Sequence, residues 1–320
     1  IFECNVEHLI DENTTEPPMS SAPLISDGKM RTYRLALAAT GEYTIYHGGT
    51  VAKALAAMNV AMTRVNGVYE KILSVTMVMV PNTDLLIYTD PNTDPYTNNN
   101  GSTMLGQNIS TCNSVIGSAN YDIGHVFSTG GGGVAYLASI CGSSKAGGVT
   151  GLTAPINDVF YIDYVAHEMG HQFGANHTFN ATTGSCGGGN RNLATAFEVG
   201  GGTTIMAYAG ICTATNNVQN NSDAYFHSAS VNEINNVITR ASDCSVKTPN
   251  NNGVPTADAG ANYTIPKGTA FVLTGAGTDP DGDPITYLWE QLDNQSSTQP
   301  PVSTATGGPN YRSFFATSSP

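Results

Sequence analysis

Three histidines and one glutamate lie within eleven residues, in the stretch "HEMGHQFGANH" from His167 to His177. Residues four positions apart lie on the same face of a helix, so a helix here presents the imidazoles of His167 and His171 to one point. Gly174 permits the positive φ of a sharp turn out of that helix. The turn lets His177 return to the same point. The pattern therefore predicts a helix, a turn and a cluster of three imidazoles.

Three neutral imidazoles with one open position are a typical ligand set of a catalytic zinc site. Zinc lowers the pKa of a water bound to it to about 7. Glu168, next to the first ligand, is placed to accept the proton of that water and to pass it to a departing amine. We therefore expect Zn2+ as cofactor, with His167, His171 and His177 as ligands and Glu168 as general base and then general acid.

These fixed positions resemble the HExxHxxGxxH zinc signature of the metzincin metallopeptidases. Metzincins carry a methionine turn beneath the metal, and the stretch "TIMAYAG" supplies Met206 at the corresponding place. Tyr208 follows two residues later, which is similar to serralysins and astacins, where the tyrosine reaches the metal or the oxyanion. The resemblance therefore implies that Met206 lies beneath the metal. It leaves Tyr208 either as an oxyanion partner or as a buried structural tyrosine.

Over residues 31–245 the order of elements resembles the reprolysin or adamalysin branch of the metzincins in its bacterial form. The resemblance implies an α/β (α+β) catalytic domain with a mixed, twisted sheet and an active-site helix. It also implies that an extended peptide substrate adds antiparallel to an edge strand. That strand would consist of Gly133, Val134, Ala135 and Tyr136. The uncharged stretch "AYAGICTAT" after Met206 would wall the specificity pocket and favours an apolar substrate side chain.

Hydrophobic periodicity predicts the other elements. Apolar residues recur every three to four positions over 49–73, which indicates an amphipathic helix. Two more helices are expected, one from about residue 157 through the histidine stretch and one over 230–241, where Ser230 and Glu233 have capping-box spacing. Strands are predicted at 31–39, 75–81, 84–89, 122–128 and within 130–142. Residues 90–111, rich in Asn, Pro, Thr and Gly, are predicted to be loop.

Composition divides the chain into four parts. Residues 1–30 are an N-terminal arm or the remnant of a pro-segment, 31–247 the catalytic domain and 248–254 a linker. Residues 255–320 contain short β-type runs separated by turns, which predicts a small all-β sandwich and resembles immunoglobulin-like or PKD modules. In that module "DPDGDP" places Asp279, Asp281 and Asp283 at alternating positions. The stretch is either a calcium site or an ordinary turn, because Pro284 stands where an EF-hand loop needs glycine.

Six cysteines without a CxxC pair suit disulfides in an exported protein better than a cysteine zinc site. Spacing alone leaves fifteen pairings open. The family resemblance implies a disulfide between Cys141 and Cys244. Cys186 and Cys212 flank the insert, the long segment between His177 and Met206, and could bridge it. Cys4 would then remain with Cys112. A zymogen thiol is the alternative role for Cys4.

A net charge of −13 excludes nucleic acid as a partner, because phosphates require clustered Lys and Arg. No apolar run is long enough to span a membrane. We therefore expect a secreted, monomeric zinc endopeptidase that acts on proteins or peptides. The alternative is a catalytically silent or latent adhesion protein that acts through its β module, and the presence of Glu168 argues against it.

Overall fold

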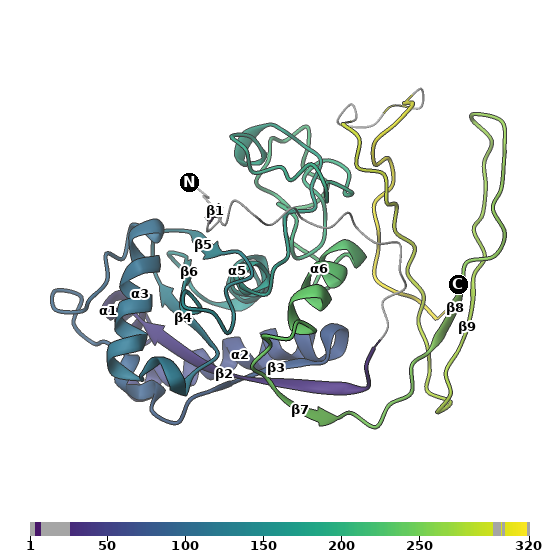
Figure 1. Cartoon of the computed structure of the whole chain (residues 1–320). Coiled ribbons are helices and arrows are strands. Elements are labelled where there is room, and N and C mark those ends of the chain that lie inside the picture. The colour runs from purple at the N-terminus through teal and green to yellow at the C-terminus, as the bar shows by residue number, and fades with distance from the viewer. Residues whose placement is uncertain (1–3, 8–25, 297–301, 303–304, 319–320) are drawn as a thin grey trace.

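A seven-stranded, mainly parallel sheet forms the centre of the molecule (Figure 1). The computed structural model describes residues 4–7, 26–296, 302 and 305–318. The strands are β1 (Cys4–Glu7), β2 (Lys29–Ala39), β3 (Val75–Met79), β4 (Ile123–Ser128), β5 (Gly133–Tyr136), β6 (Gly148–Gly151) and β7 (Val246–Pro249). Their order is β1-β5-β6-β4-β2-β3, with β7 paired to β2. The β5–β6 and β2–β7 pairs are antiparallel and the others parallel, so the expected mixed α/β sheet is confirmed.

Helices cover both faces of this sheet. The α-helices are α1 (Gly41–Tyr46), α2 (Val51–Leu73), α3 (Gly101–Val115), α4 (Asn157–Phe160), α5 (His167–Gln172) and α6 (Ser228–Ile238). A π-helical segment, η3 (Tyr161–Ala166), joins α4 to α5, and single 3-10 turns are η1 (Thr83–Leu86), η2 (Ser118–Asn120) and η4 (Gly184–Cys186). None of the described helices combines the length and the apolar character needed to cross a membrane.

The central strand β2 divides the core in two. Successive side chains of a strand point to opposite faces, so Leu35 and Leu37 pack with α2, α5 and α6, while Ala36 and Ala38 pack with α3. All four side chains are fully buried. Residues of α5 share this buried core with β2 and α2, so the histidine helix packs against the centre of the molecule.

The predicted helix over 49–73 is confirmed as α2. The side chain of Thr50 accepts a hydrogen bond from the backbone N–H of Lys53 and caps its start. Ser74 ends the helix in the left-handed conformation, at φ 53°. The buried positions, from Ala54 to Leu73, follow the apolar period seen in the sequence.

Two predictions between residues 84 and 111 are wrong. Residues 84–89 do not form a strand, since η1 occupies their start, and the predicted loop contains most of α3. The inner face of α3 is partly polar, which hides its helical period. Its Asn108 is fully buried, donating to the carbonyl of Ala146 at 2.7 Å and accepting from the hydroxyl of Tyr96 at 2.9 Å.

The last helix also starts differently from the prediction. It begins at Ser228, and the ring of His227 caps it by accepting from the backbone N–H of Ala229 at 3.1 Å. Glu233 does not complete a capping box with Ser230. Its carboxylate accepts from the backbone N–H and the side-chain amide of Asn176 instead, at 2.8 and 2.7 Å.

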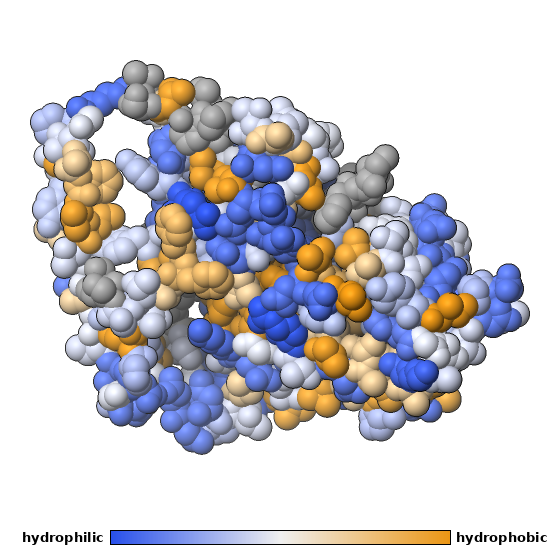
Figure 2. All heavy atoms as spheres, turned by 180° about the vertical axis from the view of Figure 1, so that it is seen from behind, coloured by the Kyte–Doolittle hydropathy of each residue, from blue (hydrophilic) through white to orange (hydrophobic). Residues whose placement is uncertain are grey.

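The C-terminal segment contains two more strands, β8 (Thr256–Asp258) and β9 (Ala276–Thr278), which form a separate antiparallel pair. Large apolar side chains are exposed here, such as Val272 at 86% and Tyr263 at 72%, and apolar residues are scattered over this segment in the rear view of Figure 2. The described residues show no second packed sheet, so the β sandwich stays a prediction. Thr248 and Pro249, expected in the linker, lie in β7.

Candidate metal centre

The three histidines of the signature stretch meet at one buried point. His167 and His171 lie one turn apart on α5, and Gly174 turns the chain at φ 101° so that His177 returns beside them. The Nε2 atom of His171 lies 3.1 Å from Nε2 of His167 and 3.2 Å from Nε2 of His177. The helix, the turn and the cluster are therefore present as predicted from the spacing. Among the described residues, this is the group of three side chains placed to share a metal ion.

The second nitrogen of each ring fixes the protonation of the cluster. Nδ1 lies 2.6 Å from the carbonyl oxygen of Ile205 in His167, 2.7 Å from that of Ala175 in His171 and 2.7 Å from that of Asn190 in His177. A carbonyl oxygen only accepts, so each Nδ1 carries the proton and donates it. Each Nε2 then presents a lone pair to the other two.

Three lone pairs in close contact repel one another unless a cation lies between them. Burial lowers the pKa of His167 to about 4, against a smaller opposing effect of its bond to Ile205, so its ring stays neutral near pH 7. Neutral imidazoles held by carbonyl groups are typical of protein zinc ligands. The donor set therefore fits a zinc ion, held by the Nε2 atoms of all three histidines.

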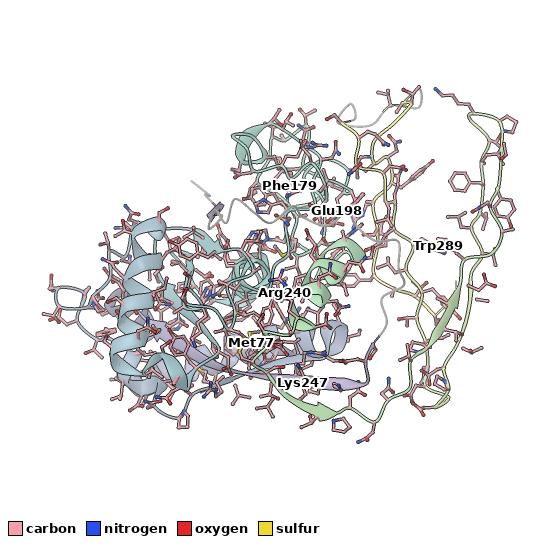
Figure 3. All side chains as sticks on the ribbon, viewed as in Figure 1. Met77, Phe179, Glu198, Arg240, Lys247 and Trp289 are labelled. Atoms are coloured by element: carbon pink, nitrogen blue, oxygen red, sulfur yellow. A yellow bond between two sulfur atoms is a disulfide. The ribbon has the colours of Figure 1, made fainter. Side chains whose placement is uncertain are left out.

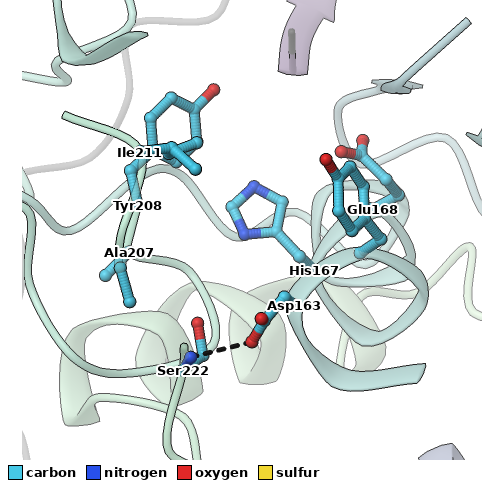
Figure 4. A pocket seen from close by; sticks show the side chains of 9 residues that line it. Asp163, His167, Glu168, Ala207, Tyr208, Ile211 and Ser222 are labelled. Atoms are coloured by element: carbon cyan, nitrogen blue, oxygen red, sulfur yellow. Dashed lines mark hydrogen bonds between the residues drawn. The ribbon is translucent and has the colours of Figure 1, made fainter. Parts of the chain in front are cut away.

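Glu168 lies beside the cluster at the start of α5 and is fully buried. Its carboxylate packs against the backbone of β5, because a Cβ added to Gly133 would come within 2.0 Å of Oε1 of Glu168. Glycine at position 133 therefore leaves the space that this carboxylate occupies. Figure 4 shows Glu168 next to His167 at the edge of a small pocket.

Met206 packs beneath the histidine helix. A Cβ added to Gly170, between the two helical histidines, would lie 2.4 Å from the sulfur of Met206. The carbonyl of Met206 also accepts from the backbone N–H of Thr178, next to His177, at 3.1 Å. This residue thus contacts both elements that carry the ligands.

The ring of Tyr208 lies over the cluster. Its centroid is 4.5 Å from that of His177, 5.8 Å from that of His167 and 4.5 Å from that of Phe179. The side chain is 2% exposed and lines the same pocket as Glu168. Both roles expected for this tyrosine, oxyanion partner and packed structural ring, are compatible with that position.

The strand expected to bind substrate is already paired on both edges. Gly133, Val134 and Ala135 pair with β6, and on the other side the four residues of β5 pair in parallel with β1. Cys4 stands opposite Gly133 in this register. The N-terminal segment therefore covers the edge to which a substrate strand was expected to add.

Two of the three expected disulfides are present. Cys141 is bonded to Cys244, and Cys186 to Cys212. The predicted pair of Cys4 and Cys112 is wrong, because Cys112 is a free thiol inside the packing between α3 and the sheet. Burial raises the pKa of that thiol to about 12, so it stays protonated.

The aspartates of "DPDGDP" do not form a calcium site in the described structure. One carboxylate oxygen of Asp279 accepts from the backbone N–H groups of Asp281 and Asp283, at 2.9 and 3.1 Å. These bonds close an exposed turn, and the three carboxylates are not gathered around one point. The turn interpretation of this stretch is the one supported.

Glu198, which no motif in the sequence identifies as functional, holds the insert against the metal centre. Figure 3 shows it in the loop region near Phe179. Its Oε1 accepts from the hydroxyls of Thr178 and Thr204 at 2.6 and 2.5 Å, and its Oε2 accepts from the backbone N–H groups of Thr203 and Thr204 at 2.7 and 3.1 Å. One buried carboxylate thus joins the residue after His177 to the residues before Met206. The signal in the sequence was a lone glutamate in the otherwise apolar and small-residue stretch "TAFEVGGG".

A mixed α/β fold with a buried triad of histidines that could share a metal ion, beside a carboxylate, is typical of metal-dependent hydrolases. The chain belongs to the M12B reprolysin-like metallopeptidase family, whose model matches residues 29–237. Members of this family are metallopeptidases, that is, metal-dependent hydrolases of peptide bonds.

Similarity to individual proteins is low. No curated protein matches the chain. Among solved structures, the crystal structure of myroilysin is 16% identical, with 73% of this chain and 90% of that chain covered and a TM-score of 0.35. A chain from a structure of a chaperone–substrate complex is 15% identical over 64% of this chain, with a TM-score of 0.36. The present chain spans about a third of the length of that second chain, 34%.

Proposed function

We propose that this chain is a secreted zinc endopeptidase that cleaves bonds within proteins at the cluster of His167, His171 and His177. The observation that carries the proposal is the set of three Nδ1–carbonyl hydrogen bonds, which leave three Nε2 lone pairs directed at one point. The two disulfides are compatible with an extracellular protein. We take residues 31–247 as the catalytic unit and 255–320 as an accessory β module.

Bound zinc would polarise the carbonyl of the scissile bond and lower the pKa of the attacking water. The carboxylate of Glu168 accepts a proton from that water and then delivers it to the nitrogen of the departing amine, so the residue ends the cycle unprotonated. The hydroxyl of Tyr208 donates a hydrogen bond to the substrate oxygen as that atom gains negative charge. Met206 holds α5 in place from below, and Gly174 supplies the turn that brings His177 to the metal.

The backbone of β5 would hold the peptide by antiparallel pairing, as an added strand. The parallel partner β1 occupies the same edge. A substrate strand can pair there only after Cys4–Glu7 has left, so the proposal includes displacement or removal of this segment.

Zinc titration of the stripped protein tests the proposal. We expect the chelator-treated chain to be inactive on a denatured protein, and cleavage to return in proportion to zinc up to one ion per chain. A His171→Ala variant should neither bind this zinc nor cleave, whereas His47→Ala, outside the cluster, should do both. Full cleavage by the zinc-free chain, or activity on small amides and esters but not on proteins, would contradict the proposal.

A further inference from the structure

A small pocket lies directly beside the proposed reacting centre. One wall is the histidine helix with its π-helical start, which contributes Asp163, His167 and Glu168. The opposite wall is the segment after Met206, which contributes Tyr208 and Ile211 (Figure 4). This space is only about 20 Å³ in volume, so the side chain of a substrate residue that flanks the scissile bond would have to widen it on entering. Glu168 and His167, which would act on that bond, line the space.

Asp163 places a carboxylate in this pocket, about one helical turn before His167. Its Oδ2 accepts from the side-chain amide of Asn221 at 2.7 Å and its Oδ1 from the backbone N–H of Ser222 at 2.8 Å. Both donors are neutral. Figure 4 shows the bond to Ser222 and the carboxylate below the ring of His167.

No cationic side chain balances this carboxylate within the described part of the chain. The pocket lining contains no Lys or Arg, and the salt bridges of the described residues involve other acidic groups. Burial raises the pKa of Asp163, against the opposing bonds from Asn221 and Ser222. A carboxylate in such surroundings gains most from a charged donor that it can reach.

We propose that Asp163 is a specificity-determining residue, and that this pocket selects a basic side chain, Lys or Arg, at one fixed position beside the scissile bond. The inference rests on the proposed peptidase function. The aliphatic groups of Ala207 and Ile211 on the pocket wall can pack along the methylene stem of such a side chain while its charged end reaches the carboxylate. The uncharged segment after Met206, taken alone, predicts a preference for apolar substrate side chains. Asp163 lies on the opposite wall of the pocket and changes that prediction to a basic side chain.

Cleavage of matched peptides tests the proposal in the whole zinc-loaded chain. Peptides that differ only in having Lys, Arg or Leu at each position near the cut would be compared by kcat/KM. We expect the wild type to prefer Lys or Arg at one position by roughly tenfold to a hundredfold over Leu, the range of a charged hydrogen bond. Asp163→Asn should lose that preference and still cleave the Leu peptide. Asp158→Asn, on the preceding helix and paired with Arg64 at the surface, should keep it.

Binding of amino-acid hydroxamates gives a second readout that needs no turnover. Lysine hydroxamate should bind the zinc-loaded wild type more tightly than leucine hydroxamate by a similar factor, and Asp163→Asn should remove the difference. If Asp163 serves only to anchor the loop at Asn221 and Ser222, the variant will lose stability without changing either ratio, and this result overturns the proposal. Absence of cleavage with a retained lysine preference in binding would refute the peptidase function and leave the pocket assignment standing.

Discussion

At the scale of single residues, the buried carboxylate of Glu198 accepts several hydrogen bonds at once. Its carboxylate is 4% exposed and accepts from two threonine hydroxyls and two backbone N–H groups at 3.1 Å or less. In Glu198→Gln, an amide NH2 would face these donors. We expect the free energy of unfolding to fall by about 3 kcal/mol and zinc affinity to fall with it, since Thr178 adjoins His177. Urea unfolding and zinc titration measure both, with exposed Glu70→Gln as control. A change below about 0.5 kcal/mol in the free energy of unfolding would show that the hydrogen bonds to Glu198 do not stabilise the fold.

His125 gives the fold a pH dependence. Burial lowers its pKa to about 4, and the hydrogen bond that its ring donates to the amide oxygen of Gln172 offsets this only in part. The unfolded chain takes up this proton near pH 6.5 and the folded chain only near pH 4, so stability is lost as the pH falls through that window. Between pH 7 and pH 5 we expect the wild type to lose about 2 kcal/mol more than His125→Gln. Unfolding curves with chelator present test this, and equal losses in both proteins would refute it.

At the scale of elements, the contact between α5 and β5 positions the proposed general base. Gly133→Ala would bring a Cβ within 2.0 Å of the carboxylate of Glu168. We expect peptide cleavage to fall at least tenfold with zinc content unchanged. Gly67→Ala is the matched control, because an added Cβ there meets open space within helix α2. It should leave cleavage unaltered and stabilise the helix by about 0.5–1 kcal/mol. Normal cleavage by Gly133→Ala would mean that the carboxylate does not need this position.

Elements differ in how far the sequence predicts them, for physical reasons. The histidine cluster is local, since helix geometry and one glycine turn bring its ligands together, and the sequence suffices for it. Helix α3 escaped prediction because buried Asn108 interrupts its apolar period. The β1–β5 pairing, the bonds of Glu198 and the place of Asp163 in the pocket depend on contacts between distant segments. Residue patterns carry little information about such contacts.

At the scale of the whole molecule, the N-terminal strand β1 occupies the edge of β5 at which we propose that substrate binds. Because β1 covers the outer edge of β5, a chain that begins at Ser26 should cleave a denatured protein faster than the full chain, at equal zinc content. Addition of a peptide with the sequence of residues 1–10 should slow the shortened chain again. Equal cleavage rates for the two chains would show that the pairing of β1 with β5 does not slow substrate binding.

The proposed peptidase activity depends on the pairing of a three-histidine metal centre with Glu168. The most direct measurement compares cleavage of a denatured protein by the wild type and by Glu168→Gln, with zinc quantified in both. We predict one zinc per chain in each protein, and a loss of at least a hundredfold in cleavage rate for the variant. Equal cleavage by the two proteins, or a zinc-loaded wild type that does not cleave even after removal of residues 1–25, would contradict the proposed activity.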